Sequence, residues 1–95
     1  MAKILITGIG GTIGTVLNNG LLNNHEITGF DLPDNNILDF PQLLQSMGGH
    51  DTVIHLAWAV KHDNWLTERF DPDNLTGAFN VLEAAQQAGV KRVII

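Results

Sequence analysis

The sequence has 95 residues, of which 44% are hydrophobic and 16% charged, so it suits one globular domain or part of one and excludes a disordered chain. Its formal net charge is −5 with only five Lys and Arg residues, which makes nucleic acid or an anionic membrane surface a poor partner. The sequence lacks cysteine, which excludes disulfides and thiolate metal sites, and no apolar run approaches the roughly 18 residues that span a bilayer.

The first predicted element is a short buried strand at residues 3–7, an apolar run that glycines close. The N-terminus leads directly into it with no signal-peptide pattern, which fits a cytoplasmic protein. Apolar residues at helical spacing then predict a helix from residue 13 to 22, and the two asparagines that follow end it. A second strand is predicted at residues 26–32, before a turn cluster.

The rest of the chain continues this alternation. Cap residues, periodicity and closing glycines predict four further elements: a helix opened by Asp39 and closed at Gly48, a strand at residues 51–57, a helix from Pro72 to about Ala88, and a strand at residues 91–95. Alternating strands and helices predict an α/β fold, a Rossmann-type doubly wound parallel sheet in βαβαβαβ order with helices on both faces. The strands are expected in the spatial order 3-2-1-4, with the fold cut off after strand 4.

Glycines at positions 8, 11 and 14 separate the first strand from the first helix. A strand, a glycine-rich turn and a helix start form an anion site, because the helix N-terminus presents free N–H groups and a partial positive charge. We expect Gly8 to permit the tight turn, Gly11 to let a pyrophosphate touch the backbone, and Gly14 to let the helix pack against the strand. The alternative is a plain loop that joins strand to helix.

Asp31 stands at the end of the second predicted strand. A carboxylate there can accept hydrogen bonds from the ribose hydroxyls of a dinucleotide and would repel a 2′-phosphate. No Arg or Lys lies in the glycine loop or directly after Asp31, so NAD is favoured over NADP as the cofactor. The alternative for Asp31 is an ordinary surface turn residue.

With these features the chain resembles the extended short-chain dehydrogenase/reductase family, the NAD-dependent epimerase/dehydratases that act mainly on sugar nucleotides. The resemblance covers nearly the whole chain. It rests on four motifs in order: the loop at residues 7–14, Asp31, the third strand at residues 53–57, and the helix opening at residues 74–85.

The resemblance implies a cofactor site built from thirteen residues: Gly8, Gly11, Thr12, Ile13, Gly14, Asp31, Leu32, Asn36, Ile37, Leu56, Ala57, Trp58 and Asn74. By the resemblance, the backbone around Gly11, Thr12 and Ile13 would hold the pyrophosphate, and Asp31 would hold the adenine ribose. The segment Leu56-Ala57-Trp58 would line the nicotinamide-ribose side, and Asn74 would brace the loop after the third strand near the cofactor. Two positions depart from the family pattern. Asn36 stands where an Asp usually lies near the adenine amine, and it can still accept a hydrogen bond. Trp58 stands where Ala or Gly is common, so its indole is expected to narrow or reshape the entrance.

The histidines offer candidate catalytic groups, but we expect none to be catalytic. His55 ends a strand and is expected to pack under the cofactor loop, while His25 and His50 are expected in turns. His62 lies with Asp63 and Glu68 in a polar loop that could touch substrate, but their spacing defines no metal site.

In the same loop, Trp65 and Phe70 are expected to anchor the loop, with sugar binding as the alternative.

The resembled family uses a Tyr-x-x-x-Lys pair and a Ser or Thr after the fourth strand, where the tyrosine acts as the general base. This sequence contains no tyrosine. We therefore expect residues 1–95 to be the NAD-binding N-terminal portion of a longer sugar-nucleotide epimerase or dehydratase, inactive alone, with the catalytic half and substrate domain outside it. The alternatives are a uronate-dehydrogenase-like or other sugar oxidoreductase, a non-catalytic NAD-sensing protein, and an interaction module without ligand.

Two expectations concern partners. The substrate of the whole enzyme is expected to be a sugar nucleotide or a sugar acid. The helix at residues 72–88 carries two apolar stripes, which indicates that it is covered on two sides. Together with the family resemblance, this predicts a homodimer through that helix.

Overall fold

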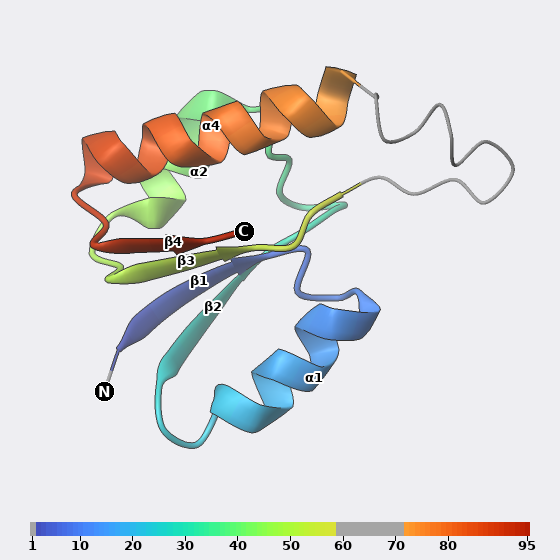
Figure 1. The fold of residues 1–95 in the computed structure, drawn as a ribbon, viewed down its shortest axis with the longest axis vertical. Helices are drawn as coiled ribbons and strands as arrows, with labels where there is room; N and C mark the ends of the chain where they lie inside the picture. The colour runs from blue at the N-terminus through green and yellow to red at the C-terminus, as the bar shows by residue number, and fades with distance from the viewer. Residues whose placement is uncertain (1, 59–71) are drawn as a thin grey trace, which may run out of the picture.

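The structure is a computed structural model that describes residues 2–58 and 72–95. Strands and helices alternate along these ranges, as Figure 1 shows, with the following bounds: β1 Lys3–Thr7, α1 Thr12–Leu21, β2 Glu26–Phe30, α2 Phe40–Met47, β3 Thr52–His55, α4 Pro72–Ala88 and β4 Arg92–Ile94. The predicted α/β Rossmann-type fold is confirmed. Strands β2, β3 and β4 end one or two residues before their predicted ends.

The four strands form one parallel sheet in the order β2-β1-β3-β4. The predicted order 3-2-1-4 was wrong, since the third strand pairs with β1 and not outside β2. The reason lies in which face each connecting helix covers. A right-handed crossover through α1 moves the chain to one side of β1, and a right-handed crossover through α2 on the opposite face moves it back past β1.

The two faces of the sheet are covered by different helices (Figure 1). Side chains alternate along β1, so Leu5 joins a buried cluster with Leu43 of α2 and Val81 of α4. Ile4 and Ile6 point to the other face, where Leu17 and Leu21 of α1 pack against them. The prediction of helices on both faces is therefore confirmed.

The ends of the helices follow their capping residues. The Asp39 side chain accepts a hydrogen bond from the Gln42 backbone N–H at 3.2 Å, which satisfies a free donor of the first turn of α2. Gly89 ends α4 with a φ of +76°, a conformation that favours glycine. Both helix boundaries were predicted from these residues.

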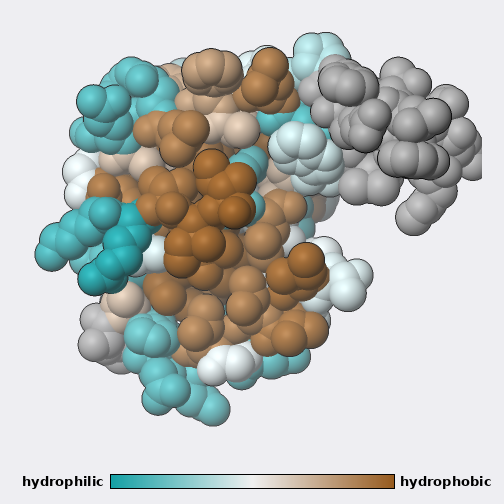
Figure 2. Space-filling model, viewed as in Figure 1, coloured by the Kyte–Doolittle hydropathy of each residue, from teal (hydrophilic) through white to brown (hydrophobic). Residues whose placement is uncertain are grey.

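One face of α4 is buried and the other is not. The buried face packs in the core through Val81, Ala84 and Ala85. The other face exposes Leu75, Phe79 and Leu82, and Phe79 has 64% of its surface accessible to solvent. Figure 2 shows apolar side chains gathered over the centre of the face where β4 forms the edge of the sheet. The predicted second covering of α4 is therefore not made within the described part of this single chain.

Candidate functional site

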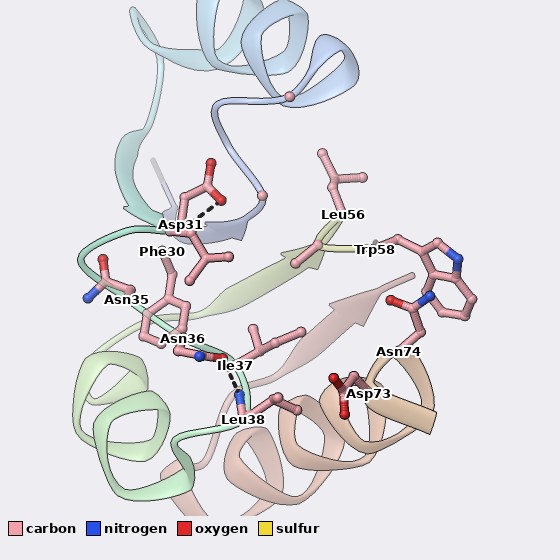
Figure 3. Close-up of a pocket in the computed structure, with 14 residues that line it drawn as sticks. Phe30, Asp31, Asn35, Asn36, Ile37, Leu38, Leu56, Trp58, Asp73 and Asn74 are labelled. Carbon is pink, nitrogen blue, oxygen red and sulfur yellow. Dashed lines mark hydrogen bonds between the residues drawn. The ribbon is translucent and has the colours of Figure 1, made fainter. Parts of the chain in front are cut away.

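A pocket of about 460 Å³ opens where the carboxyl ends of β1, β2 and β3 meet the start of α4. In parallel α/β sheets, ligands bind at this edge of the strands. Its lining residues come from six separate stretches of chain (Figure 3): Gly8, Gly11, Phe30, Asp31, Leu32, Asn35, Asn36, Ile37, Leu38, Leu56, Ala57, Trp58, Asp73 and Asn74. Ten of these are among the thirteen residues predicted to bind cofactor.

Gly8 bonds the end of β2 and lies close against the segment that follows β3. It adopts a φ of +69°, and its N–H donates to the Phe30 carbonyl at 3.0 Å. A Cβ at this position would lie 2.8 Å from the Ala57 backbone nitrogen. Any side chain here would therefore strain the backbone and push away the segment after β3, which agrees with the tight-turn role predicted for Gly8.

Three of the thirteen predicted cofactor residues, Thr12, Ile13 and Gly14, do not line the pocket. Gly14 is buried, and a Cβ on it would lie 2.6 Å from the carbonyl oxygens of Gly8 and Ile9. It therefore lets α1 pack against the glycine turn itself and not, as predicted, against the strand. Thr12 and Ile13 are exposed in the first turn of α1, where the backbone N–H groups lack partners within the helix.

That first turn contains no acidic residue, and its N-cap, Gly11, makes no side-chain hydrogen bond to the helix. The partial positive charge of the helix end is thus left without a carboxylate of the same helix turn to offset it. Gly11 lines the pocket, so this helix end lies at the pocket's edge. The arrangement suits an anionic group such as a pyrophosphate.

Asp31 contacts the glycine turn directly at the edge of the pocket. One carboxylate oxygen, Oδ2, accepts the Gly10 N–H at 2.9 Å, and the other, Oδ1, accepts the Leu32 N–H at 2.9 Å. A carboxylate offers about four acceptor positions, so it can still accept hydrogen bonds from a ligand. Asp31 therefore has a structural function that its sequence position did not reveal: it holds the glycine turn against the end of β2.

The chain after β2 forms a polar loop along the pocket. The Asn36 side-chain oxygen accepts the Leu38 N–H at 2.9 Å, and the Asn36 N–H donates to the Gln42 side chain at 3.1 Å. Asn36 is thus held on both sides, and Figure 3 shows it among the lining residues with Ile37 and Leu38. Phe30, Asn35 and Leu38 line the pocket but were not predicted, although their adjacency to Asp31 and Asn36 was a usable signal.

A buried hydrogen-bond cluster underlies the β3 side of the pocket. The Thr7 hydroxyl lies 2.7 Å from His55 Nδ1 and also accepts the N–H groups of Leu56 at 3.1 Å and Ala57 at 3.2 Å. Because two donors occupy the hydroxyl's acceptor positions, its own proton is directed at Nδ1. His55 is therefore the neutral tautomer that carries its proton on Nε2.

His55 is 4% exposed, and this burial lowers the pKa of its ring below the ordinary value of 6.5. Among the described residues, Nε2 has no hydrogen-bond partner. His55 is thus buried, as predicted, and bonded to Thr7 directly before the glycine turn. The ring bonds Thr7, whose hydroxyl in turn holds the segment after β3, and it does not line the pocket.

The far side of the pocket is formed by Trp58, directly after β3, and by Asp73 and Asn74 in the first turn of α4 (Figure 3). The Trp58 indole is 48% exposed, as expected for a residue at the entrance, whereas Asn74 is 3% exposed. Asp73 was not predicted, although it directly precedes a predicted residue.

The other predicted groups lie elsewhere. His25 accepts the Ala2 N–H through Nδ1, and His50 bonds the Thr28 hydroxyl, both before strands and so at the opposite end of the sheet. The predicted loop residues His62, Asp63, Trp65, Glu68 and Phe70 lie outside the described residues.

In residues 2–58 and 72–95, no group of His, Asp and Glu is arranged to hold a metal ion. No helix in these ranges is long and apolar enough to cross a bilayer.

Comparison with known proteins gives consistent matches. A sequence model of the NAD dependent epimerase/dehydratase family matches residues 4–95. The L-arabinose 1-dehydrogenase (NAD(P)(+)) of Haloferax volcanii is 31% identical over an alignment of 102 positions that covers 99% of this chain and 40% of that protein. The crystal structure of the Bordetella bronchiseptica enzyme WbmG in complex with NAD is 30% identical with a TM-score of 0.82, covering 97% of this chain and 36% of that one.

The fold also matches a dTDP-glucose 4,6-dehydratase from Streptomyces venezuelae, with a TM-score of 0.84 at 24% identity, over 96% of this chain and 38% of that one. The chain therefore spans between a third and two fifths of the length of these relatives.

Proposed function

The chain belongs to the NAD dependent epimerase/dehydratase family, as its motifs predicted, and we propose that its pocket binds NAD. The observation that carries the proposal is the meeting of Asp31 with the glycine turn. Two motifs separated by the whole of α1 and β2 are joined at 2.9 Å, on the edge of a pocket of about 460 Å³. A plain connecting loop requires neither the carboxylate nor the open pocket beside it.

In this proposal each end of the cofactor meets a group suited to it. The pyrophosphate lies against the backbone of Gly11 and the first turn of α1, including Thr12 and Ile13. The adenosine ribose hydroxyls donate to the Asp31 carboxylate, and the adenine lies along the loop of Asn36 and Ile37. The nicotinamide ribose lies toward Leu56, Ala57 and Trp58, near Asn74. Bound NAD would supply a hydride acceptor, and the residues described here would hold and orient it.

The preference for NAD over NADP follows from charge. A 2′-phosphate would approach the Asp31 carboxylate, and no cationic residue is among the described residues that line the pocket. Two negative groups in contact repel each other, and no cationic side chain among the described pocket residues offsets that repulsion. The ratio of the two affinities is therefore a direct test of the role of Asp31.

For the whole protein we propose a sugar-nucleotide epimerase or dehydratase, in which residues 1–95 are the cofactor-binding portion and the catalytic base and substrate domain lie outside it. A second candidate is a sugar or uronate dehydrogenase, which the similarity to L-arabinose 1-dehydrogenase favours. A non-catalytic NAD-sensing protein is a third. A Tyr-x-x-x-Lys pair in the remainder of the protein would separate both enzymes from the sensor.

The test is isothermal titration calorimetry with NAD and with NADP. We expect NAD to bind more tightly, and Asp31→Ala to weaken NAD by about 1–3 kcal/mol because ribose hydroxyls lose their acceptor. Asp34→Ala removes the same charge from the nearby turn at a position that does not line the pocket, and it should leave the affinity unchanged. Tighter binding of NADP, or no binding of either dinucleotide, would contradict the proposal.

A further inference from the structure

The loop between β2 and α2 is held in place by α4, an element far away in the sequence. The side-chain amide of Asn80 donates to the Ile37 backbone carbonyl at 2.8 Å. The Ile37 side chain lies directly over Gly77, one helical turn before Asn80. Residues three apart on a helix share one face, so Gly77 and Asn80 together form a seat for a single loop residue.

Any larger residue at position 77 would force the Ile37 side chain to shift. A Cβ on Gly77 would lie 3.1 Å from Ile37 Cγ1 and would collide with Cδ1. Glycine is otherwise an unfavourable residue in the middle of a helix, and Gly77 is neither a helix end nor a residue of positive φ. Its presence is explained by the close approach of Ile37.

Ile37 connects this seat to the pocket. It lines the pocket between Asn36 and Leu38, whereas Gly77 and Asn80 do not line it. The loop is also bonded at Asn36, whose N–H donates to Gln42 of α2. The loop is thus fixed to α2 on one side and to α4 on the other.

We propose that Gly77 and Asn80 are positioning residues that set the adenine end of the cofactor site through Ile37. The proposal rests on the proposed NAD site and deepens it. With Ile37 seated, Asn36 and the adjoining backbone groups stand at fixed places, so they can select for a base by its pattern of donors and acceptors. With the seat lost, the loop still touches the base but no longer enforces that pattern.

Adenine and hypoxanthine distinguish these two states. Adenine presents an amine donor beside the ring acceptor N1, whereas hypoxanthine presents a carbonyl acceptor beside an N1–H donor. A fixed set of protein groups that pairs with one base leaves polar groups unpaired with the other. A positioned loop should therefore discriminate NAD from nicotinamide hypoxanthine dinucleotide, and a loosened loop should discriminate less.

The experiment measures the Kd of both dinucleotides by calorimetry, with thermal unfolding of each variant recorded alongside. Asn80→Asp keeps the size of the side chain but cannot donate to the Ile37 carbonyl. Gly77→Ala adds the colliding Cβ, and Gly77→Ala combined with Ile37→Val removes the Cδ1 atom it meets. Gln86→Ala, at an exposed position of the same helix, is the matched control.

We expect Asn80→Asp to weaken NAD roughly 2- to 13-fold, the factor of one ordinary hydrogen bond, and Gly77→Ala to weaken it by a similar factor because it displaces Ile37. Both variants should weaken the hypoxanthine dinucleotide less. Ile37→Val should restore affinity to the Gly77→Ala protein, and Gln86→Ala should behave as wild type. Folded variants with wild-type affinity for NAD would overturn the inference, as would an equal loss for both dinucleotides. If the wild-type protein binds neither dinucleotide, the proposed function itself fails and the inference with it.

Discussion

Replacing Thr7 by valine tests whether the buried cluster at the end of β1 supports the cofactor pocket. The Thr7 side chain is fully buried, and its hydroxyl bonds His55 and the N–H groups of Leu56 and Ala57. Valine has nearly the same shape, so Thr7→Val removes the hydroxyl without leaving a large cavity. The effect therefore reports on hydrogen bonds and hardly at all on packing.

The expected magnitude follows from the partners left behind. The Leu56 N–H keeps an acceptor, because it also donates to the Thr7 carbonyl at 3.1 Å. His55 Nδ1 and the Ala57 N–H lose theirs, and each unsatisfied buried group costs about 1–3 kcal/mol. Ala57 is only half-buried, so its cost lies at the low end. We expect Thr7→Val to lower the free energy of unfolding by about 2–4 kcal/mol.

Urea denaturation gives this value as a shift of the midpoint at constant slope. Thr7→Ser is the matched control, because it keeps the hydroxyl and loses one methyl group, at a cost of about 1 kcal/mol. Nitrogen-15 NMR of the His55 ring should show the proton on Nε2 in the wild type. In Thr7→Val the populations of the Nε2–H and Nδ1–H tautomers should change. A valine variant as stable as the serine variant would refute the assigned hydrogen-bond network.

Further predictions concern backbone space, pH and assembly. Gly8→Ala should destabilise the fold and abolish NAD binding, because φ is +69° and the new Cβ would lie 2.8 Å from the Ala57 nitrogen; circular dichroism and calorimetry measure the two effects. Burial lowers the pKa of His55, so the unfolded state binds the proton more readily and the free energy of unfolding should fall as the pH drops below 6.5. His55→Gln should flatten that part of a curve of stability against pH. An unchanged curve would contradict the effect of burial. The hydrogen bond from the Lys3 backbone N–H lowers the pKa of Asp51 in the folded protein. The ionised carboxylate therefore stabilises the fold above pH 3.8, and this stabilisation is lost as the pH falls through the lowered pKa. Asp51→Asn should accordingly lower the thermal midpoint at pH 7 and have no such effect in acid. We propose that the exposed apolar face of α4 forms a homodimer, and Phe79→Asp should then convert a dimer to a monomer in light scattering; a wild-type protein that is monomeric at micromolar concentration would exclude it.

Local sequence determined the elements of this protein and the identity of much of its site. Gly8 needs no distant partner to adopt its left-handed conformation, and Asp39 caps α2 through a residue three positions away. The alternation of strands and helices was sufficient for the Rossmann-type fold. The order of the motifs along the chain predicted most of the residues that line the pocket. The predicted residues follow the carboxyl ends of parallel strands or lie in the first turn of a helix, and these segments meet at one edge of the sheet.

Tertiary structure decided what depends on contacts between distant segments. The strand order follows from α2 covering the face opposite α1, a choice of sides that the periodicity of neither helix reveals. Asp31 bonds Gly10 across 21 positions, and Asn80 bonds Ile37 across 43. Such contacts depend on side chains that reach across a folded core, so a sequence pattern names the participating residues without showing which of them meet. For this reason the glycines and Asp31 were predicted as a site, whereas the seat that α4 provides for Ile37 became visible only in the folded chain.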